Sequence, residues 1–279
     1  MTAVILSLLS AVLYGVGDFW GALASRRSHI LQVLPTILIS GTLTVIVLIP
    51  WLGADFSPLA IRYGVASGFF GALGFFIFYR ALAIGPMGIA SAIIAIVSTT
   101  IMYIVDVLKG THVSTLGVVG AALAMASIVL VSKSTEDATH PVTAKMVQTA
   151  ILSGVVVAVF FMLLAYAPSD SGVATFTCTR LTQLVLICTS AFLLRNKIQR
   201  GAKPSLKMSI GAGVADALAA VAFIFANHSG SLAFIAVISN LYPAVTLIIA
   251  HFVIHERVER HQYVGMAGAV ASVALLTLA

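Results

Sequence analysis

Residues 224–259 read IFANHSGSLAFIAVISNLYPAVTLIIAHFVIHERVE, and this stretch decides how the rest of the chain is interpreted. One hydrophobic helix is predicted to end near Asn227, and after Gly230 a second is predicted from about Ser231 to Ile254. Polar side chains and a proline lie in the middle of this second helix: Ser239, Asn240, Tyr242 and Pro243. Such residues are costly in lipid unless neighbouring helices or a watery cavity satisfy them. The pattern favours a helix that lines a pocket, and the alternative is a proline kink with small polar residues packed between helices.

The composition indicates a membrane protein. Of the 279 residues, 60% are hydrophobic and only 9% are charged, whereas a soluble domain carries about 25% charged residues. Apolar runs of about 20 residues, long enough to cross a bilayer, recur along the whole length. The net charge of +6 does not indicate a nucleic-acid partner, because the basic residues lie in loops beside these runs, where they set the topology.

Ten transmembrane helices are predicted from these runs. They cover residues 2–24, 31–52, 60–80, 86–107, 114–132, 146–166, 172–194, 207–226, 231–254 and 261–279. The first run follows Met1 and Thr2 without a basic region, so we expect a retained helix and not a cleaved signal peptide. The loops are short apart from 132–145 and 195–207, and no soluble domain is predicted.

The two halves of the chain resemble each other. A polar linker, residues 133–145, separates residues 1–132 from residues 146–279, with five predicted helices in each half. A shift of 145 positions places Gly85 on Gly230, and it aligns small residues of the last helix in each half: Gly120, Ala122, Ala124, Ala126 and Ser127 with Gly265, Ala267, Ala269, Ala271 and Ser272. An odd number of helices per half inverts the second repeat across the membrane. The sequence therefore predicts an all-α membrane protein built from two inverted five-helix repeats.

Several motifs resemble those of one transporter family. They are Tyr14-Gly15 with Asp18-Phe19, Ser25-Arg26-Arg27, Tyr79-Arg80-Ala81-Leu82 with Gly85-Pro86, the helix of Ser239–Pro243 with His255-Glu256-Arg257, and Gly265–Leu276. Over essentially the whole chain the sequence resembles the ten-helix, EamA-like branch of the drug/metabolite transporter superfamily. The resemblance implies that each half is an EamA-like repeat and that the protein carries a metabolite. One position departs from the pattern, because Thr111 stands where the first repeat often has a glutamate cap like Glu256.

The orientation in the membrane is predicted differently by two arguments. The loops after odd-numbered helices are basic, with Arg26, Arg27, Arg80, Lys133, Lys145, Arg195, Lys197, Arg200, Lys203, Lys207, Arg257 and Arg260. The loops after even-numbered helices hold only Arg62 and Lys109. The positive-inside rule then places both termini outside, whereas the family resemblance implies cytoplasmic termini. We follow the loop charges here.

Ionisable residues inside the spans are the candidate site residues. Asp216 lies near the centre of the eighth helix, Asp18 lies about two thirds along the first with Tyr14 one turn earlier, and Arg180 lies inside the seventh. Each is costly in hydrocarbon and is expected to face a cavity or a partner. Asp216 is the preferred candidate for proton coupling, with Asp18 second. The alternatives are an interhelical hydrogen bond for Asp216, and for Arg180 an ion pair with either acid or snorkelling to the interface.

Other candidates complete the predicted substrate site. Phe223 and Asn227 follow Asp216 on the same face of the eighth helix, and Ser239, Asn240 and Tyr242 come from the ninth, with Pro243 as a helix kink. Aromatic residues near helix ends are typical of membrane interfaces rather than of pockets. This places four residues at the interface: Trp20, Tyr79, Tyr103 and Tyr166.

The sequence predicts no cofactor, metal site or enzyme activity. Cys178 and Cys188 lie ten residues apart in one span, too far to form a disulfide with each other. No nucleophile–base pair, phosphate-binding loop or metal-ligand spacing is present. The expected partners are the bilayer, a small molecule and protons as a coupling ion, and the expected state is a monomer or weak dimer in a bacterial plasma membrane.

Three functions stay open at the level of sequence. The first is a secondary transporter, and specifically an exporter, of a small polar or amphipathic metabolite such as an amino acid, which works by alternating access with or without proton coupling. The second is a flippase for a lipid-linked sugar or lipid carrier, which requires a groove open to the bilayer. The third is a membrane protein that does not transport. The inverted repeat favours the first.

Overall fold

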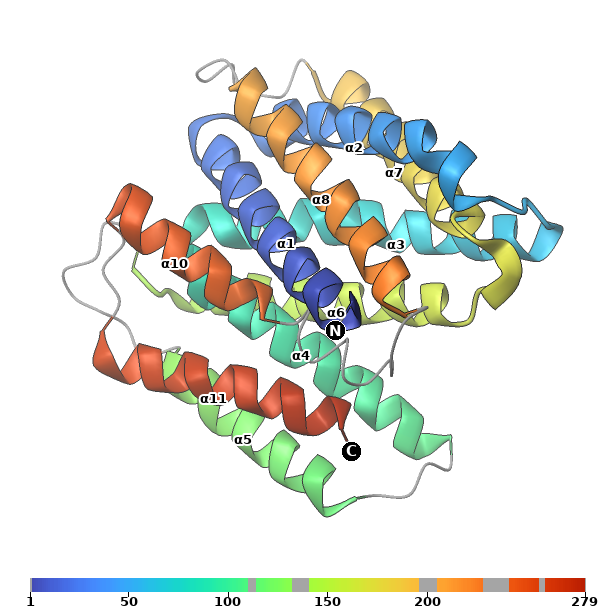
Figure 1. Ribbon diagram of the computed structural model, residues 1–279. Coiled ribbons are helices and arrows are strands. Elements are labelled where there is room, and N and C mark those ends of the chain that lie inside the picture. The colour runs from blue at the N-terminus through green and yellow to red at the C-terminus, as the bar shows by residue number, and fades with distance from the viewer. Residues whose placement is uncertain are drawn as a thin grey trace.

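The computed structural model describes residues 2–109, 114–131, 141–195, 205–227, 241–255 and 259–278. Within these ranges the chain forms ten α-helices and one short 3₁₀ turn. The elements are α1 (Thr2–Arg27), α2 (Ile30–Leu52), α3 (Pro58–Ile84), α4 (Met87–Leu108), α5 (Thr115–Val131), α6 (Ala144–Ala165), η1 (Ser169–Ser171), α7 (Ala174–Leu193), α8 (Leu206–Asn227), α10 (Tyr242–Ile254) and α11 (Arg260–Thr277). Figure 1 shows them as one bundle, with α1 beside α8 and α5 beside α11.

The helices follow the predicted spans. Each predicted span except the ninth corresponds to one helix whose ends differ by a few residues. In the ninth span residues 242–254 form α10, while residues 231–240 lie outside the described residues. Seven described helices are long and apolar enough to cross a membrane, and three shorter apolar helices cover Thr115–Ser127, Tyr242–Ile254 and Tyr263–Leu275.

Local sequence signals fix several helix starts. The Ser57 hydroxyl accepts a hydrogen bond from the Ala60 N–H at 3.2 Å. Pro58 occupies the first turn of α3, where a backbone N–H has no helical partner, so the lack of one in proline costs no hydrogen bond. The Thr143 hydroxyl accepts from the Met146 N–H at 3.2 Å and caps α6 in the same way. These caps set where the chain turns back into the bundle after the α2–α3 and α5–α6 connections.

The outward faces of the helices carry large apolar side chains. Val47, Phe69, Val185 and Phe252 are all more than half exposed. In water such a surface would be a strong aggregation liability, whereas in a bilayer it is the surface that meets lipid. The buried positions, by contrast, are rich in alanine, glycine, serine and threonine, which allow helices to approach closely.

The helix contacts are symmetric between the two halves of the chain: replacing each helix by its counterpart in the other half gives contacts that are also present. The first five helices, α1 to α5, correspond in chain order to α6, α7, α8, α10 and α11. α1 packs against α8, and its counterpart α6 packs against α3. α3 packs against α7 as α8 packs against α2, and α4 packs against α6 as α10 packs against α1. Each of these contacts joins one half of the chain to the other, as expected for inverted repeats that interlock.

Two glycines, one in each half of the chain, show the same symmetry of contacts in atomic detail. A Cβ on Gly15 of α1 would lie 2.6 Å from Val245 side-chain atoms and 3.0 Å from the carbonyl oxygen three residues earlier in α10. A Cβ on Gly154 of α6 would lie 2.6 Å from Val97 and 3.0 Å from the carbonyl oxygen three residues earlier in α4. Gly154 follows Gly15 by 139 residues and Val245 follows Val97 by 148, so the offset in these helices differs from 145. The division into two inverted repeats stays a prediction that this packing supports.

A glycine face on α3 packs tightly against α7, as the spacing of Gly64 and Gly68 predicts. A Cβ on Gly64 would lie 2.8 Å from the Thr175 carbonyl oxygen, and one on Gly68 would lie 2.8 Å from that of Thr179. Between them the Ser67 and Thr179 hydroxyls are hydrogen-bonded at 2.6 Å. This face brings α7 close enough to α3 for the α7 side chains described below to reach the bundle interior.

The first prediction compares two glycines of α3. Gly68→Ala should lower the thermal stability of the purified protein in detergent, because the new Cβ would lie 2.5 Å from the Thr182 Cβ as well as against the Thr179 carbonyl, and overpacking costs about 1–3 kcal/mol. Gly74→Ala is the matched control, since its nearest atoms would be side chains of Val156 and Val157 at 3.6 Å. Equal stability of the two variants would contradict the close α3–α7 contact.

Candidate functional site

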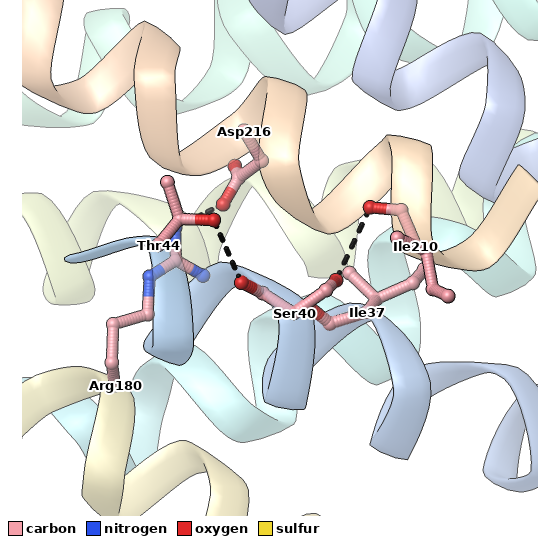
Figure 2. Close-up of polar contacts among 6 residues, drawn as sticks. All are labelled: Ile37, Ser40, Thr44, Arg180, Ile210 and Asp216. Atoms are coloured by element: carbon pink, nitrogen blue, oxygen red, sulfur yellow. Dashed lines mark hydrogen bonds and ion pairs between the residues drawn. The ribbon is translucent and has the colours of Figure 1, made fainter. Parts of the chain in front are cut away.

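An ion pair joins Arg180 of α7 to Asp216 at the middle of α8. The Arg180 Nη2 donates to the Asp216 Oδ2, and the two side chains are 4% and 13% exposed. Figure 2 shows the Arg180 guanidinium pointing from α7 toward the Asp216 carboxylate on α8. The sequence left two possible ion-pair partners for Arg180, Asp18 and Asp216, and the structure pairs it with Asp216. Pairing lets two charges lie inside the bundle, where either one alone would be very costly.

Aromatic rings enclose the rest of the Arg180 guanidinium. Its Cζ lies 4.8 Å from the Phe176 ring centre and 5.5 Å from that of Phe75 on α3. Its Nε and Nη1 are buried without a hydrogen-bond partner among the described residues, and the same is true of the Gln183 Oε1 one turn later. The cation is therefore held by one carboxylate and two π-faces, an arrangement that suits arginine better than lysine.

α2 is fixed over the part of α8 that carries Asp216. A Cβ on Gly41 would lie 3.0 Å from the Gly213 carbonyl oxygen, so the two backbones approach closely. The Ser40 hydroxyl donates to the Ile210 carbonyl at 3.2 Å, and the Thr44 hydroxyl donates to the Ser40 carbonyl at 2.8 Å (Figure 2). α2 itself carries no ionisable side chain, so it covers the ion pair without adding charge.

Asp18 of α1 faces the same region of α8. A Cβ on Gly17 would lie 3.2 Å from the Ala212 carbonyl oxygen and 3.4 Å from the Asp216 backbone nitrogen, so α1 and α8 touch beside the ion pair. The charges of Asp18 and Asp216 interact electrostatically. Asp18 is half-buried, and its carboxylate has neither a hydrogen bond nor an ion pair in the described part of the chain. It is the unpaired charge of the site.

Three tyrosines lie along the part of α1 that carries Asp18. Tyr14 lies one turn earlier on α1, and its ring centre is 6.2 Å from that of Tyr242 at the start of α10. Tyr79 of α3 reaches across to Gly21, where a Cβ would overlap the tyrosine ring. Tyr79 is 1% exposed and stacks on Phe75 at 5.9 Å. The interface position predicted for Tyr79 is therefore wrong, because the glycine on α1 makes room for a buried ring.

The other predicted site residues lie elsewhere or outside the described residues. Phe223 packs with Ala3 and Leu6 in a small cluster at the start of α1, away from the ion pair. Pro243 occupies the first turn of α10, where a proline interrupts no helical hydrogen bond. Several other predicted positions lie outside what the structure describes: Ser239, Asn240, the side chain of Asn227, the cap residue Glu256, and Thr111, which stands at the equivalent position in the first half.

The glycines at 15, 17 and 21 are neighbours of Asp18 on α1 whose packing role the sequence analysis did not identify. They allow close approach of α10, α8 and the Tyr79 ring, respectively. Glycine is a poor helix former, so three of them around an acidic residue within one apolar span was a signal that several elements converge there.

Comparisons with known proteins agree with this architecture. Residues 144–278 match the EamA-like transporter family. The second half of the chain belongs to that family. EamA-like proteins are membrane transporters of the drug/metabolite transporter superfamily and not enzymes, so the chain is a multi-pass membrane transporter, and the predicted all-α membrane fold is confirmed. The family match does not extend to residues 1–143, and the assignment of residues 1–132 as a second EamA-like repeat stays a prediction.

A solved structure extends the fold similarity over nearly the whole chain. Among 23 matching chains, one crystal structure covers 96% of this chain and 98% of its own, with a TM-score of 0.54 and 17% sequence identity. At that identity the likeness concerns the fold alone. No curated protein matches the chain. Within the described residues, no three His, Cys, Asp or Glu side chains lie close enough to hold a metal ion.

The ion pair yields a prediction for stability. Arg180→Met and Asp216→Leu should each destabilise the protein, by about 3–5 kcal/mol, because each leaves a buried charge unpaired. The double variant should be more stable than either single variant. Thermal unfolding in detergent measures all three, with Arg62→Met as the control for loss of an exposed arginine of α3. Purely additive losses in the double variant would show that the two residues do not depend on each other.

Proposed function

We propose that the protein is a secondary transporter, working as an exporter, for a small polar or amphipathic metabolite such as an amino acid, and that it works by alternating access with proton coupling. The observation that supports this is the unpaired Asp18 carboxylate beside the Arg180–Asp216 pair. It lies on inward faces of α1, α3, α7, α8 and α10, which come from both halves of the chain. A site shared by two repeats is where alternating access exposes a substrate to one side and then to the other.

Of the two acidic candidates for coupling, the geometry supports Asp18. The Asp216 carboxylate is already occupied by the Arg180 guanidinium. Asp18 has no cation beside it within the described chain. A carboxylate without a partner is the one that is free to exchange a proton with water. Asp216 therefore serves to hold Arg180, and Asp18 exchanges the proton.

A flippase is the alternative with an observation in its favour. A cavity of about 280 Å³ between α4, α10 and α11 has an apolar lining that includes Ala92, Leu247, Met266 and Val270. An acyl chain would suit such a lining. Among the described residues that line the cavity, only Tyr263 carries an ionisable group that could bind a headgroup, so we favour the metabolite transporter.

Transport by the purified protein in liposomes tests the proposal. Vesicles loaded with a mixture of the twenty amino acids should release one or a few of them faster when the outside is made acidic, as measured by mass spectrometry of the filtrate. Asp18→Asn should lose this acceleration and keep exchange down a concentration gradient, because an amide cannot carry a proton. Asp55→Asn, at an exposed position between α2 and α3, is the control.

Two results would count against the assignment. If Asp18→Asn keeps full proton-driven release, the coupling group is not Asp18 and Asp216 takes its place as the candidate. If the wild-type protein releases no amino acid but moves a fluorescent lipid between leaflets, the flippase alternative replaces the transporter of small metabolites.

A further inference from the structure

α10 and α11 are kept apart by the apolar cavity described above. Within the described residues both helices pack against α4, but they make hardly any contact with each other, and Figure 1 shows them spread apart. Their counterparts in the first half, α4 and α5, do pack on each other. The floor of the cavity is buried and comes from Ala92 and Ala95 of α4, whereas Ile248, Tyr263 and Ala267 on its rim are exposed. The cavity therefore opens outward, toward the lipid that meets these helices.

The cavity has a polar group and a cation at one end only. The apolar part of α11 begins at Tyr263, and Arg260 precedes it by one turn on the same side of the helix. Arg260 is exposed and has no ion-pair partner among the described residues, while the neighbouring Glu259 carboxylate contacts the His261 ring at 3.1 Å. From Tyr263 to Val273 the remaining α11 lining is apolar, over about 15 Å of helix. The site thus joins a free guanidinium at the membrane surface to an apolar channel that runs inward.

The size and lining of the cavity select its occupant. An α-helix with its side chains is about 10–12 Å wide, too wide for a cavity of about 280 Å³ that extends along three helices. A buried water needs two to four polar partners, and the lining offers one hydroxyl, that of Tyr263. An empty gap would lose the dispersion contacts of its walls. An unbranched hydrocarbon chain fits all three conditions, and the surrounding bilayer supplies one.

We propose that this cavity is the binding site of a resident anionic phospholipid, with one acyl chain between α10 and α11 and the phosphate on Arg260 and the Tyr263 hydroxyl. A guanidinium is well suited to a phosphate because it donates two parallel hydrogen bonds. Arg260 also lies on the side of the membrane that the loop charges predict to be cytoplasmic, where anionic lipids are found.

The bound lipid stays in place and is not carried across the membrane. Beyond Tyr263 the described lining holds no polar side chain along which a headgroup could pass. The lipid acts by filling the space between α10 and α11 and so holds both helices on α4. This inference goes beyond the proposed transport function and does not depend on it, because none of the residues that line the cavity belongs to the Asp18 site.

Native mass spectrometry of the full-length protein in detergent tests the headgroup contact. The probes are phosphatidylglycerol and phosphatidylcholine with identical acyl chains, added in equal amounts. We expect the wild type to retain one phosphatidylglycerol, with a preference of about tenfold over phosphatidylcholine, because Arg260 makes a charge-assisted contact with the phosphate of a headgroup that has no cation of its own. Arg260→Gln should bind both lipids about equally. Arg27→Gln, which removes an exposed arginine at the end of α1 on the same side of the membrane, is the control and should keep the preference.

Thermal unfolding in detergent tests the acyl-chain contact. Phosphatidylglycerol should raise the unfolding temperature of the wild type, because a ligand that binds only the folded state stabilises it. Ala267→Phe should abolish this rise, since the new ring occupies the rim of the cavity, and it should still fold because position 267 is exposed. Ala122→Phe is the matched control: the 145-residue shift aligns Ala122 with Ala267, and Ala122 is exposed on α5 and does not line the cavity.

A third measurement uses the wild-type protein, so it does not depend on the folding of a variant. A phosphatidylglycerol with a photoreactive group in its acyl chain is added in detergent at one lipid per protein, and peptide mass spectrometry locates the products. The label should fall on the cavity walls, within residues 243–248 of α10 and 263–273 of α11. Equal labelling of the outward faces of α2 or α7 would overturn the proposal.

The remaining outcomes separate the lipid site from the transport function. An unchanged preference in Arg260→Gln, or an undiminished rise in unfolding temperature in Ala267→Phe, would each overturn the lipid site and leave the transport proposal as it stands. Movement of phosphatidylglycerol between the leaflets of liposomes that contain the wild type would contradict a resident lipid and favour the flippase. Release of amino acids by liposomes, with no lipid movement, agrees with both proposals together.

Discussion

The Arg180–Asp216 ion pair is the interaction on which the rest of the interior depends. A lone arginine or aspartate inside a membrane protein is costly, and the pair is tolerated only with close geometry and aromatic enclosure. The pair links α7 to α8 through side chains alone, because α2 packs against both helices, and α3 lies alongside α7 with Phe75 against the guanidinium. It also pairs the charge of Asp216, whereas Asp18 has no ion-pair partner among the described residues. In the proposed mechanism, this difference decides which acid exchanges the proton.

The small residues around the pair explain how five helices reach one point. Glycines on α1 admit α10, α8 and the ring of Tyr79, while the glycines of α3 admit α7. Serine and threonine hydroxyls then join helix backbones across these contacts, as Ser10 does to the Ala219 carbonyl at 2.9 Å. Such small residues let the helices approach one another closely, and this approach is what brings side chains from both halves of the chain together at the site.

Much of the fold could be predicted from the sequence, because apolar runs of transmembrane length are a strong signal and the short loops leave few alternatives. The ionisable residues Asp18, Arg180 and Asp216 were found in the same way, since charge inside a span is rare. The sequence offered an ion pair of Arg180 with either acid as one alternative. It could not choose between the two acids, because that choice depends on the rotation of each helix about its axis, and apolar residues on all faces of a helix leave this rotation unspecified. Tyr79 was misplaced for that reason: its position near a helix end is typical of an interface, and only the contact with Gly21 shows that it points inward. The inverted repeat stays a prediction.

The most direct test of the account is the access of water to α1 in the membrane. The central claim is that the face of α1 carrying Tyr14 and Asp18 lines an aqueous path, while the opposite face meets lipid. With Cys178 and Cys188 replaced by alanine, Tyr14→Cys and Val12→Cys should be compared for reaction with a charged, water-soluble thiol reagent in native membranes. Val12 is 45% exposed on the lipid side and Tyr14 is half-buried within the bundle. The account predicts fast reaction at position 14 and little at position 12. No reaction at position 14, or faster reaction at position 12, would contradict it.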